Sequence, residues 1–321
     1  MKKSLLALAV LGSTLGAAQA QSTVTLYGRI DMAVMHNNLF GGPSQFSVDS
    51  GTISGSRWGL SGSEDLGGGL KVNFNLEQGF AGDTGLAPAG QAFSRQSWVG
   101  FSGAFGEFRM GKPWTAYDDV SGAHNGMFDS AFSVENNFFR TTGYAANPAN
   151  SLRYTTPTFG GFSAAVSYSL DEVAGVKGNT KSISGMFVTG PLQLAAGHQV
   201  EELGATDQKF TRMSGSYDFG SFVLKGLYGH FRWPVTGKTS EYSLGLDYPV
   251  SSALTVSGSF GYSKDSAAAG GTKSKGFTVG AMYAMSKRTD FYVGLTDWDG
   301  KAGGVKTVGN TRYGLGVRHS F

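Results

Sequence analysis

The sequence has no cysteine and, past residue 20, no apolar run of 18 residues. The absence of cysteine excludes disulfide bonds and thiolate metal sites. The absence of a long apolar run excludes a membrane-spanning helix, which needs about 20 apolar residues. A β-barrel escapes this second test, because only every second residue of its strands faces lipid. The five histidines, which show no metal-ligand spacing, are His36, His124, His198, His230 and His319. We therefore expect neither a metal nor another cofactor.

Charged residues are also scarce, at 15% of the chain. Residues 1–20 combine Lys2 and Lys3 with a short apolar stretch and end in Ala18-Gln19-Ala20, so they are predicted to be a secretory signal peptide. Residues 21–321 are expected to form one domain. Without the two leader lysines, 24 basic residues stand against 23 acidic ones, so charge gives no reason to expect nucleic acid as a partner.

Glycine (50 residues) and aromatic side chains (13%) are abundant. Disordered chains are poor in aromatic residues, and collagen needs a glycine at every third position, which is not found here. Apolar Val24, Leu26 and Ile30 alternate with polar Thr25 and Arg29. A period of two predicts a strand with one apolar and one polar face. The same alternation recurs at 70–77, 162–171 and 312–321.

About sixteen segments of this kind follow one another along the chain. Short connections follow the even-numbered segments, and longer, polar connections follow the odd-numbered ones, as in outer-membrane barrels. The longer connections include 37–51, 82–90, 171–180 and 264–274. The predicted strands lie near 23–36, 52–63, 69–81, 91–103, 106–112, 150–157, 161–171, 180–189, 191–200, 208–219, 221–232, 239–249, 252–264, 274–286, 288–298 and 307–321.

The polar faces of these strands carry charged and amide side chains, which would lack partners in a dry interior. Sixteen strands also enclose an aqueous lumen rather than a packed core. We therefore predict an all-β fold, a 16-stranded antiparallel transmembrane β-barrel whose apolar side chains face lipid and whose polar side chains face water.

One connection, residues 113–150, is far longer than the others. A structureless loop of this length is usually functional or disordered, and its aromatic content argues against disorder. We predict that it folds into the barrel and narrows the pore. Its aromatic residues are Trp114, Tyr117, Phe128, Phe132, Phe138, Phe139 and Tyr144.

Several motifs resemble the general porins of Gram-negative bacteria, particularly the β-proteobacterial trimeric type. The resemblance implies a homotrimer in the cell outer membrane that passes small hydrophilic solutes by diffusion, without enzymatic activity. It also implies contacts with outer-membrane lipids, lipopolysaccharide and the barrel assembly machinery. The motifs are TLYG at 25–28, GSRWGLSGSEDLG at 55–67, FSRQSWVG at 93–100, NSLRY at 150–154, LDY at 246–248, SKRT at 286–289 and GVRHSF at 316–321.

In that family, basic residues on one wall of the pore face acidic residues on the long loop. The resemblance places Arg57, Arg95 and Arg153 in the basic wall, and alternation puts them on the polar face. Because arginine keeps its charge, a surplus of arginine at the constriction would make the pore prefer anions. The loop departs from the enterobacterial pattern Pro-Glu-Phe-Gly-Gly-Asp, which leaves the facing acid open. The loop candidates are Asp118, Asp119, Glu135 and Arg140.

The aromatic residues suggest two further roles. Tyr313 and Phe321, on the apolar face of the last strand, resemble the signal that the assembly machinery recognises, although they could also be ordinary lipid-facing residues. The tryptophans expected in interfacial girdles are Trp58, Trp98, Trp233 and Trp298.

Two other classes of function stay open. A substrate-selective outer-membrane channel would show a conductance block that saturates with one solute. A barrel enzyme or a surface adhesin would show activity or host binding without single-channel steps. A Ser/His/Asp site is not recognisable in the sequence, since such groups meet only in space.

Overall fold

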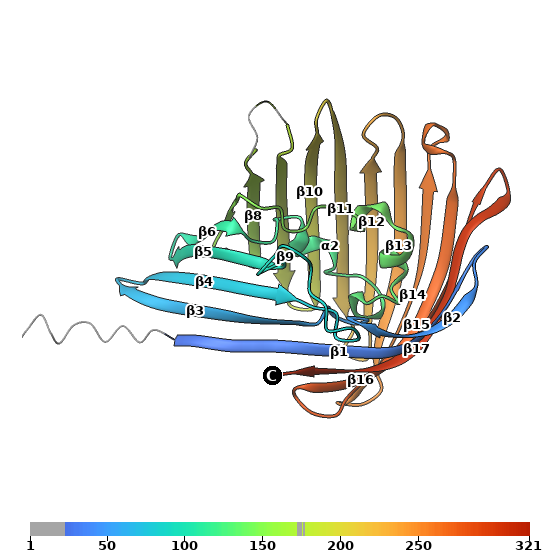
Figure 1. Ribbon diagram of the computed structural model, residues 1–321, viewed down its shortest axis with the longest axis horizontal. Coiled ribbons are helices and arrows are strands. Elements are labelled where there is room, and N and C mark those ends of the chain that lie inside the picture. Colours follow the sequence, from blue (N-terminus) through green and yellow to red (C-terminus); the bar gives the residue numbers. More distant parts are fainter. Residues whose placement is uncertain (1–22, 172–174, 176) are drawn as a thin grey trace, which may run out of the picture.

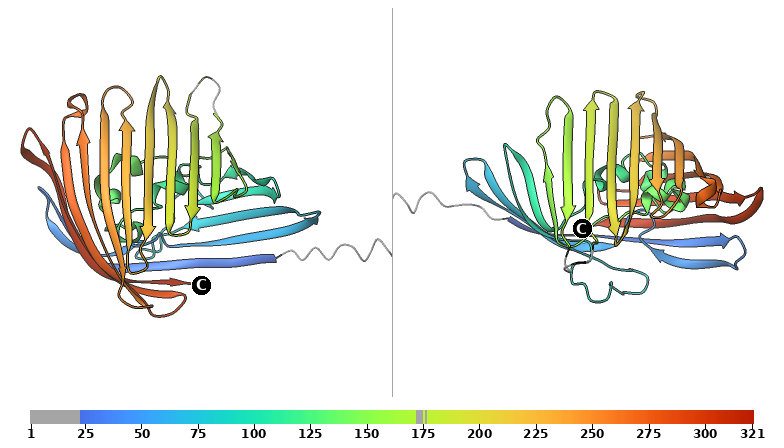
Figure 2. Two further views of the ribbon diagram at one scale, coloured as in Figure 1. Left: turned by 180° about the vertical axis from the view of Figure 1, so that it is seen from behind. Right: turned by 90° about the horizontal axis from the view of Figure 1, so that it is seen from above.

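The computed structural model describes residues 23–171, 175 and 177–321, so the predicted signal peptide lies outside the described residues and stays a prediction. In the described part, 17 strand segments form one antiparallel sheet that curls round on itself (Figures 1 and 2). None of the described helices is long and apolar enough to cross a membrane. The strands are β1 (Thr23–Leu39), β2 (Ser44–Ser50), β3 (Arg57–Gly67), β4 (Leu70–Gly79), β5 (Gln96–Gly103), β6 (Gly106–Lys112), β7 (Ser151–Thr155), β8 (Phe162–Ser169), β9 (Thr180–Thr189), β10 (Leu192–Leu203), β11 (Thr206–Asp218), β12 (Val223–Arg232), β13 (Lys238–Pro249), β14 (Leu254–Asp265), β15 (Lys273–Ala284), β16 (Thr289–Ala302) and β17 (Val305–Ser320).

Strand β1 closes the barrel. Its residues 29–39 pair with β17 on one side. On the other side, residues 23–29 pair with β3 and residues 32–38 pair with β2. Because β2 and β3 continue one another beside β1, they form a single strand of a 16-stranded barrel. The predicted fold class and strand number are therefore confirmed.

The first connection differs from the prediction. The stretch 37–51 was expected to be a long loop, but β1 runs to Leu39 and β2 begins at Ser44, so the turn covers only 40–43. Residues 52–56, predicted as strand, leave the sheet instead, and Asp31 accepts hydrogen bonds from the N–H groups of Ile53 (2.8 Å) and Ser54 (2.7 Å). Strands pair through their backbones, so a stretch in which only Phe46 and Val48 are apolar can still join a hairpin.

Side chains are sorted between lipid and lumen in the inside-out manner that alternation predicted. The apolar Val24 and Leu26 are 63% and 61% exposed on the outer face. The charged Asp31, Arg212 and Glu241 are 0% exposed on the inner face. A soluble protein would show the reverse distribution.

The tryptophans do not form the predicted girdles. Only Trp58 is exposed on the outer face. Trp298 lies in the lumen 5.3 Å from Phe138, ring centre to ring centre. Trp98 and Trp233 each lie beneath a guanidinium group, and these side chains too are turned away from the lipid. Alternation along β16 puts Trp298 on the same face as Gly294 and Thr296, which contact Phe132 of the loop, so its position on the lumen side follows from its own strand.

The two ends of the barrel carry different connections. The C-terminal Phe321 exchanges two backbone hydrogen bonds with Gly28, both 3.0 Å, at the end that carries the turns 190–191, 219–222, 250–253 and 285–288. The opposite end carries the longer connections 80–95, 113–150, 170–179 and 266–272, although 204–205 and 303–304 at this end are tight turns. Longer loops are extracellular in outer-membrane barrels. We refer to this second end as the extracellular end.

Candidate functional site

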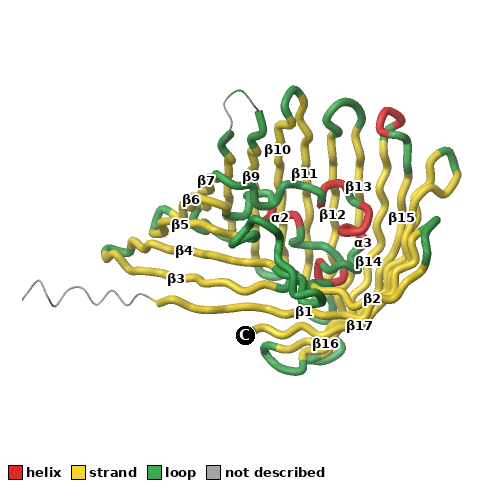
Figure 3. Tube along the Cα trace, viewed as in Figure 1, coloured by secondary structure: helices red, strands yellow, loops and turns green. Residues whose placement is uncertain are grey.

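The long connection between β6 and β7 lies inside the barrel, as predicted (Figure 3). Its helices contact the inner face of the wall formed by β9 to β15. Residues 113–150 therefore occupy lumen that would otherwise be open to water. The helices are α2 (Asp118–Ser121), η1 (Met127–Asp129), α3 (Val134–Phe138) and η2 (Arg140–Thr142).

Glycines in the barrel wall make room for the loop. Met127 lies against Gly280 and Phe132 against Gly294, and a Cβ atom at either glycine would collide with the loop side chain. Both loop side chains are fully buried. Glycine is needed here because another chain segment approaches the wall too closely for a side chain.

Polar groups of the wall fix the backbone of the loop. Ser167 accepts a hydrogen bond from the N–H of Ala116 at 3.0 Å, and Ser257 accepts one from the N–H of Met127 at 3.0 Å. Glu241 accepts hydrogen bonds from the N–H of Arg140 and from the hydroxyl of Thr141. These contacts satisfy loop N–H groups that would otherwise be buried without partners.

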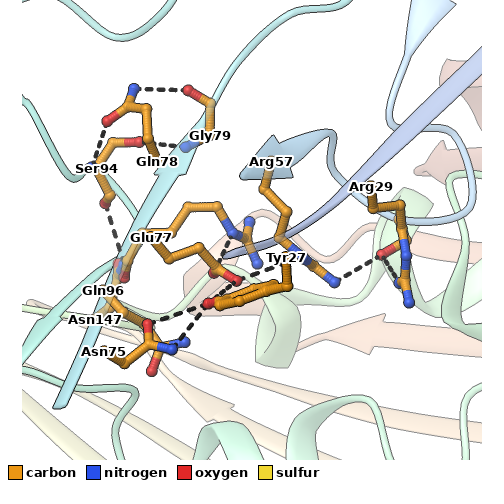
Figure 4. A network of polar contacts seen from close by, with 12 residues as sticks. Tyr27, Arg29, Arg57, Asn75, Glu77, Gln78, Gly79, Ser94, Gln96 and Asn147 are labelled. Atoms are coloured by element: carbon orange, nitrogen blue, oxygen red, sulfur yellow. Dashed lines mark hydrogen bonds and ion pairs between the residues drawn. The ribbon is translucent and has the colours of Figure 1, made fainter. Parts of the chain in front are cut away.

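Two of the three predicted wall arginines share one carboxylate (Figure 4). Arg95 donates from Nε to Glu77 Oε1 at 2.7 Å, and Arg57 Nε lies 3.5 Å from Glu77 Oε2. The hydroxyl of Tyr27 also donates to Glu77, at 3.1 Å. Glu77, on β4, was not assigned to the site from the sequence, because alternation gives its face but not its neighbours on other strands.

A further arginine, Arg29 on β1, lies beside this pair. The sequence put it on the polar, lumen-facing side of its strand but did not assign it to the constriction. It donates to the hydroxyls of Ser54 (2.8 Å) and Ser320 (3.2 Å). Arg57 donates to the same Ser54 oxygen at 3.3 Å. In the described part of the chain Arg29 has no ion pair, so this cluster has three guanidinium groups and one carboxylate in direct contact with them.

Arg153 has a different environment from the other two predicted arginines. Its Nη2 donates to both carboxylate oxygens of Asp119, at 2.8 and 2.6 Å. Its Nη1 donates to the carbonyl oxygens of Trp114 (3.1 Å) and Thr115 (3.0 Å). Arg153 is only 7% exposed. It therefore fastens the start of the loop to β7, and Asp119 balances its charge.

Asp118, the residue before Asp119, borders a cavity of about 420 Å³ in the lumen, together with Asp129, Asn136 and Tyr144. The hydroxyl of Tyr144 donates to Asp118. Burial raises the pKa of the Asp118 carboxyl from 3.8 to about 6. Burial also raises the pKa of Asp129, although the side-chain amides of Asn136 and Asn125 oppose this by donating to it.

The last two loop candidates lie away from that cavity. Glu135 is fully buried, and its Oε1 accepts a hydrogen bond from the N–H of Gly126 at 3.4 Å. The guanidinium of Arg140 lies 5.0 Å from the ring centre of Trp233. Of the predicted loop acids, the structure thus brings only Asp119 into direct contact with a predicted wall arginine.

The two predicted assembly residues lie on the outer face of β17 and at its end. Tyr313 stacks on His36 with ring centres 4.6 Å apart. Phe321 covers Gly28, whose missing side chain makes room for the ring. Elsewhere, the described residues contain no cluster of three His, Asp or Glu side chains that could hold a metal ion.

Comparisons with known proteins agree on one family. The family model of Gram-negative porins matches residues 7–303. The outer membrane porin protein 32 of Delftia acidovorans is 36% identical over 363 residues, and an outer membrane porin protein of Bordetella pertussis is 30% identical over 393 residues. Both alignments cover 100% of each chain.

Solved structures give the same result. An anion-selective porin from Comamonas acidovorans superposes with a TM-score of 0.81 at 30% identity, covering 94% of this chain and 100% of that chain. The trimer form of OmpT from Vibrio cholerae superposes with a TM-score of 0.73, covering 94% and 99% of the two chains. At 17% identity this second likeness concerns the fold alone.

Proposed function

Since the chain belongs to the Gram-negative porin family and forms a diffusion channel for small hydrophilic solutes in the cell outer membrane, we propose that its pore prefers anions. Arg57, Arg95 and Arg153 belong in this proposal to the basic side of the constriction, and the loop 113–150 narrows the lumen opposite them. Fixed charges act strongly in such a place, because the walls of a narrow pore have a low dielectric constant.

The sharing of Glu77 by Arg57 and Arg95 carries the proposal. One carboxylate balances one guanidinium, so the pair keeps about one positive charge, and arginine does not lose its proton. Arg29 adds a further charge, and its hydrogen bonds to described residues go to the hydroxyls of Ser54 and Ser320. An anion entering the constriction therefore meets a positive surplus, whereas a cation is repelled.

The loop contributes less negative charge than its sequence suggests. Asp119 is engaged by Arg153, and Glu135 is fully buried. We assign the acidic side of the constriction to Asp118, which borders the lumen cavity. Arg140 is assigned a supporting role, because its guanidinium lies over Trp233.

One relative supports this picture. The solved structure from Comamonas acidovorans is described as an anion-selective porin, and it is 30% identical to this chain. We propose on the family premise that this chain is a homotrimer without catalytic activity. We further propose that the barrel assembly machinery recognises Tyr313 and Phe321.

The test is the zero-current potential of the purified protein in planar lipid bilayers across a KCl gradient. The proposal predicts a potential of the sign given by chloride permeation. A potential of the opposite sign would contradict it. Replacing chloride with a series of organic anions separates general diffusion from a substrate-selective channel, which would show a block that saturates with one solute.

A further inference from the structure

The short segment between β2 and β3, residues 51–56, brings a hydroxyl group to the arginines of the constriction. Ile53 belongs to one buried apolar cluster with Met127 of the long loop. The carbonyl oxygen of Thr52 accepts a hydrogen bond from the N–H of Ala131, also in the loop, at 2.7 Å. The segment is therefore held between the barrel wall and the loop inside it.

Asp31, an inner-face residue of β1, fixes the backbone of this segment. Its Oδ2 accepts hydrogen bonds from the N–H groups of Ile53 (2.8 Å) and Ser54 (2.7 Å), and its Oδ1 accepts one from the hydroxyl of Tyr292. Arg318, the cross-strand partner of Asp31, forms its ion pair with a different carboxylate. The carboxylate of Asp31 thus orients Ser54 instead of pairing with this neighbouring arginine.

The hydroxyl oxygen of Ser54 accepts hydrogen bonds from two arginines. Arg29 donates to it from Nη1 at 2.8 Å, and Arg57 donates from Nη2 at 3.3 Å (Figure 4). A serine hydroxyl has two acceptor sites and one O–H donor, so only the O–H is left. Among the described residues none accepts a hydrogen bond from it, and Ser54 is partly exposed. The O–H is therefore free to donate to a solute in the lumen.

Two guanidinium nitrogens beside this hydroxyl are free as well. In the part of the chain that the structure describes, Arg29 Nη2 and Arg57 Nη1 donate to no residue, and neither atom is buried. With the O–H of Ser54 they make three donors around one oxygen atom. Hydrogen bonds from such donors to an ionised acceptor are short and strong. The arrangement therefore favours an anion that accepts hydrogen bonds strongly over an anion of equal charge that accepts them weakly.

We propose that Ser54 determines selectivity among anions, because its hydroxyl donates to the permeating anion, and that Asp31 is the residue that positions it. The anions favoured are small carboxylates and other oxyanions that accept hydrogen bonds strongly. The inference rests on the proposed function, since it concerns the same constriction. It differs in what is selected: the arginines prefer anions to cations, whereas Ser54 distinguishes one anion from another.

The test compares formate with nitrate, two small planar anions of equal charge, of which formate is the stronger hydrogen-bond acceptor. Potentials of the purified protein in planar bilayers, with chloride on the opposite side, give the permeability of each anion relative to chloride. We expect Ser54→Ala to lower the ratio of formate to nitrate permeability about threefold, because a hydrogen bond to a charged group is lost. Ser54→Thr, which keeps the hydroxyl, should keep a ratio close to that of the wild type.

The matched control is Ser61→Ala, which removes a hydroxyl from the lumen-facing side of β3, on the same face as Arg57 by alternation. It should leave the ratio of formate to nitrate permeability unchanged. The role of Ser54 would be overturned by an equal fall in Ser54→Ala and Ser61→Ala, or by no fall in Ser54→Ala.

Asp31→Ala tests the positioning role. The N–H groups of Ile53 and Ser54 lose their acceptor, so the ratio of formate to nitrate permeability should fall as it does in Ser54→Ala. Loss of a negative charge alone would raise the permeability of both anions together and leave their ratio unchanged. Tyr292→Phe, a milder change that frees Oδ1 of Asp31, should lower the ratio less but in the same direction. An unchanged ratio in Tyr292→Phe and in folded Asp31→Ala would overturn the positioning role.

The zero-current potential across a KCl gradient separates this inference from the proposed function. Ser54→Ala should keep the sign of a chloride-selective pore while its ratio of formate to nitrate permeability falls. If Ser54 only held the arginines in place, the preference for anions over cations would fall and the ratio would not, which would contradict the inference. A cation-selective wild type would contradict the proposed function itself.

Discussion

A single nitrogen of Arg153 donates to both carboxylate oxygens of Asp119, at 2.8 and 2.6 Å, and so ties the barrel wall to the loop inside it. The wall residue lies on β7, and the loop residue lies in α2. Arg153 is nearly buried, and its remaining donors bind backbone carbonyl oxygens at the start of the loop. This contact is therefore as much a part of the constriction's architecture as of its charge.

Replacing Asp119 with Asn should loosen the loop. A nearly buried guanidinium would lose its counter-charge, and we expect a loss of about 1–3 kcal/mol in the free energy of unfolding, with more current noise in single-channel records. The control is Asp207→Asn, which breaks an exposed pair with Lys209 and should cost about 0.5 kcal/mol or less. Equal losses in the two variants would argue against an anchoring role.

Adding a methyl group to the wall at Gly294 should displace the loop. A Cβ there collides with the ring of Phe132, so Gly294→Ala should destabilise the protein by about 1–3 kcal/mol and change the single-channel conductance. Gly226→Ala is the matched control, because nothing lies within 4 Å of a Cβ at that strand position. A normal conductance in Gly294→Ala would mean that the loop does not depend on this close contact.

The preference for anions should rise as the pH falls from about 7 to 5. Burial raises the pKa of Asp118 from 3.8 to about 6, so this carboxyl becomes neutral over that interval and the loop loses negative charge. His124 does not contribute, because burial and the charge of Lys225 lower its pKa to about 4. Zero-current potentials recorded at both pH values measure the change.

The variant Asp118→Asn isolates this carboxyl. It should show the stronger anion preference at both pH values, so its zero-current potential should not change between pH 7 and pH 5. The raised pKa also means that ionising Asp118 lowers the stability of the folded state as the pH rises from 3.8 to about 6. Above that interval the variant should unfold at a higher temperature than the wild type. If the zero-current potential of Asp118→Asn still changed between the two pH values, another group would be responsible for the titration.

Removing Phe321 should reduce the yield of folded protein in the outer membrane several-fold. The deletion removes both backbone hydrogen bonds to Gly28 and the ring that covers it. Leu315→Ala, which truncates an exposed apolar residue of β17, separates the signal from ordinary lipid contact. Normal yield of the deletion variant, measured by heat-modifiability on gels, would exclude the assembly role.

The sequence predicted the barrel well, because a period of two survives in every strand that has lipid on one side and water on the other. It failed at 37–51, where only Phe46 and Val48 alternate with polar residues, a pattern too short to predict the strand β2. It also failed for Trp298, which was assigned to a girdle although alternation along its own strand puts it with Gly294 and Thr296 on the lumen side.

Only part of the site was predicted, because alternation describes one strand at a time. Alternation could put Arg57 and Arg95 on the inner face, but it could not pair them with Glu77, since contacts between side chains on different strands depend on register and on the bend at 92–95. Arg29 was predicted to be a basic residue that faces the lumen, but it was not assigned to the constriction.

The shared carboxylate at Glu77 is tested most directly by the zero-current potential across a KCl gradient, compared between the wild type and Arg57→Gln/Arg95→Gln. The account predicts a chloride-selective wild type and a double variant whose potential shifts toward cation selectivity. Glu77→Gln should shift it in the opposite direction, because two arginines are then left without their common counter-charge. A potential that is the same in all three proteins would contradict the account.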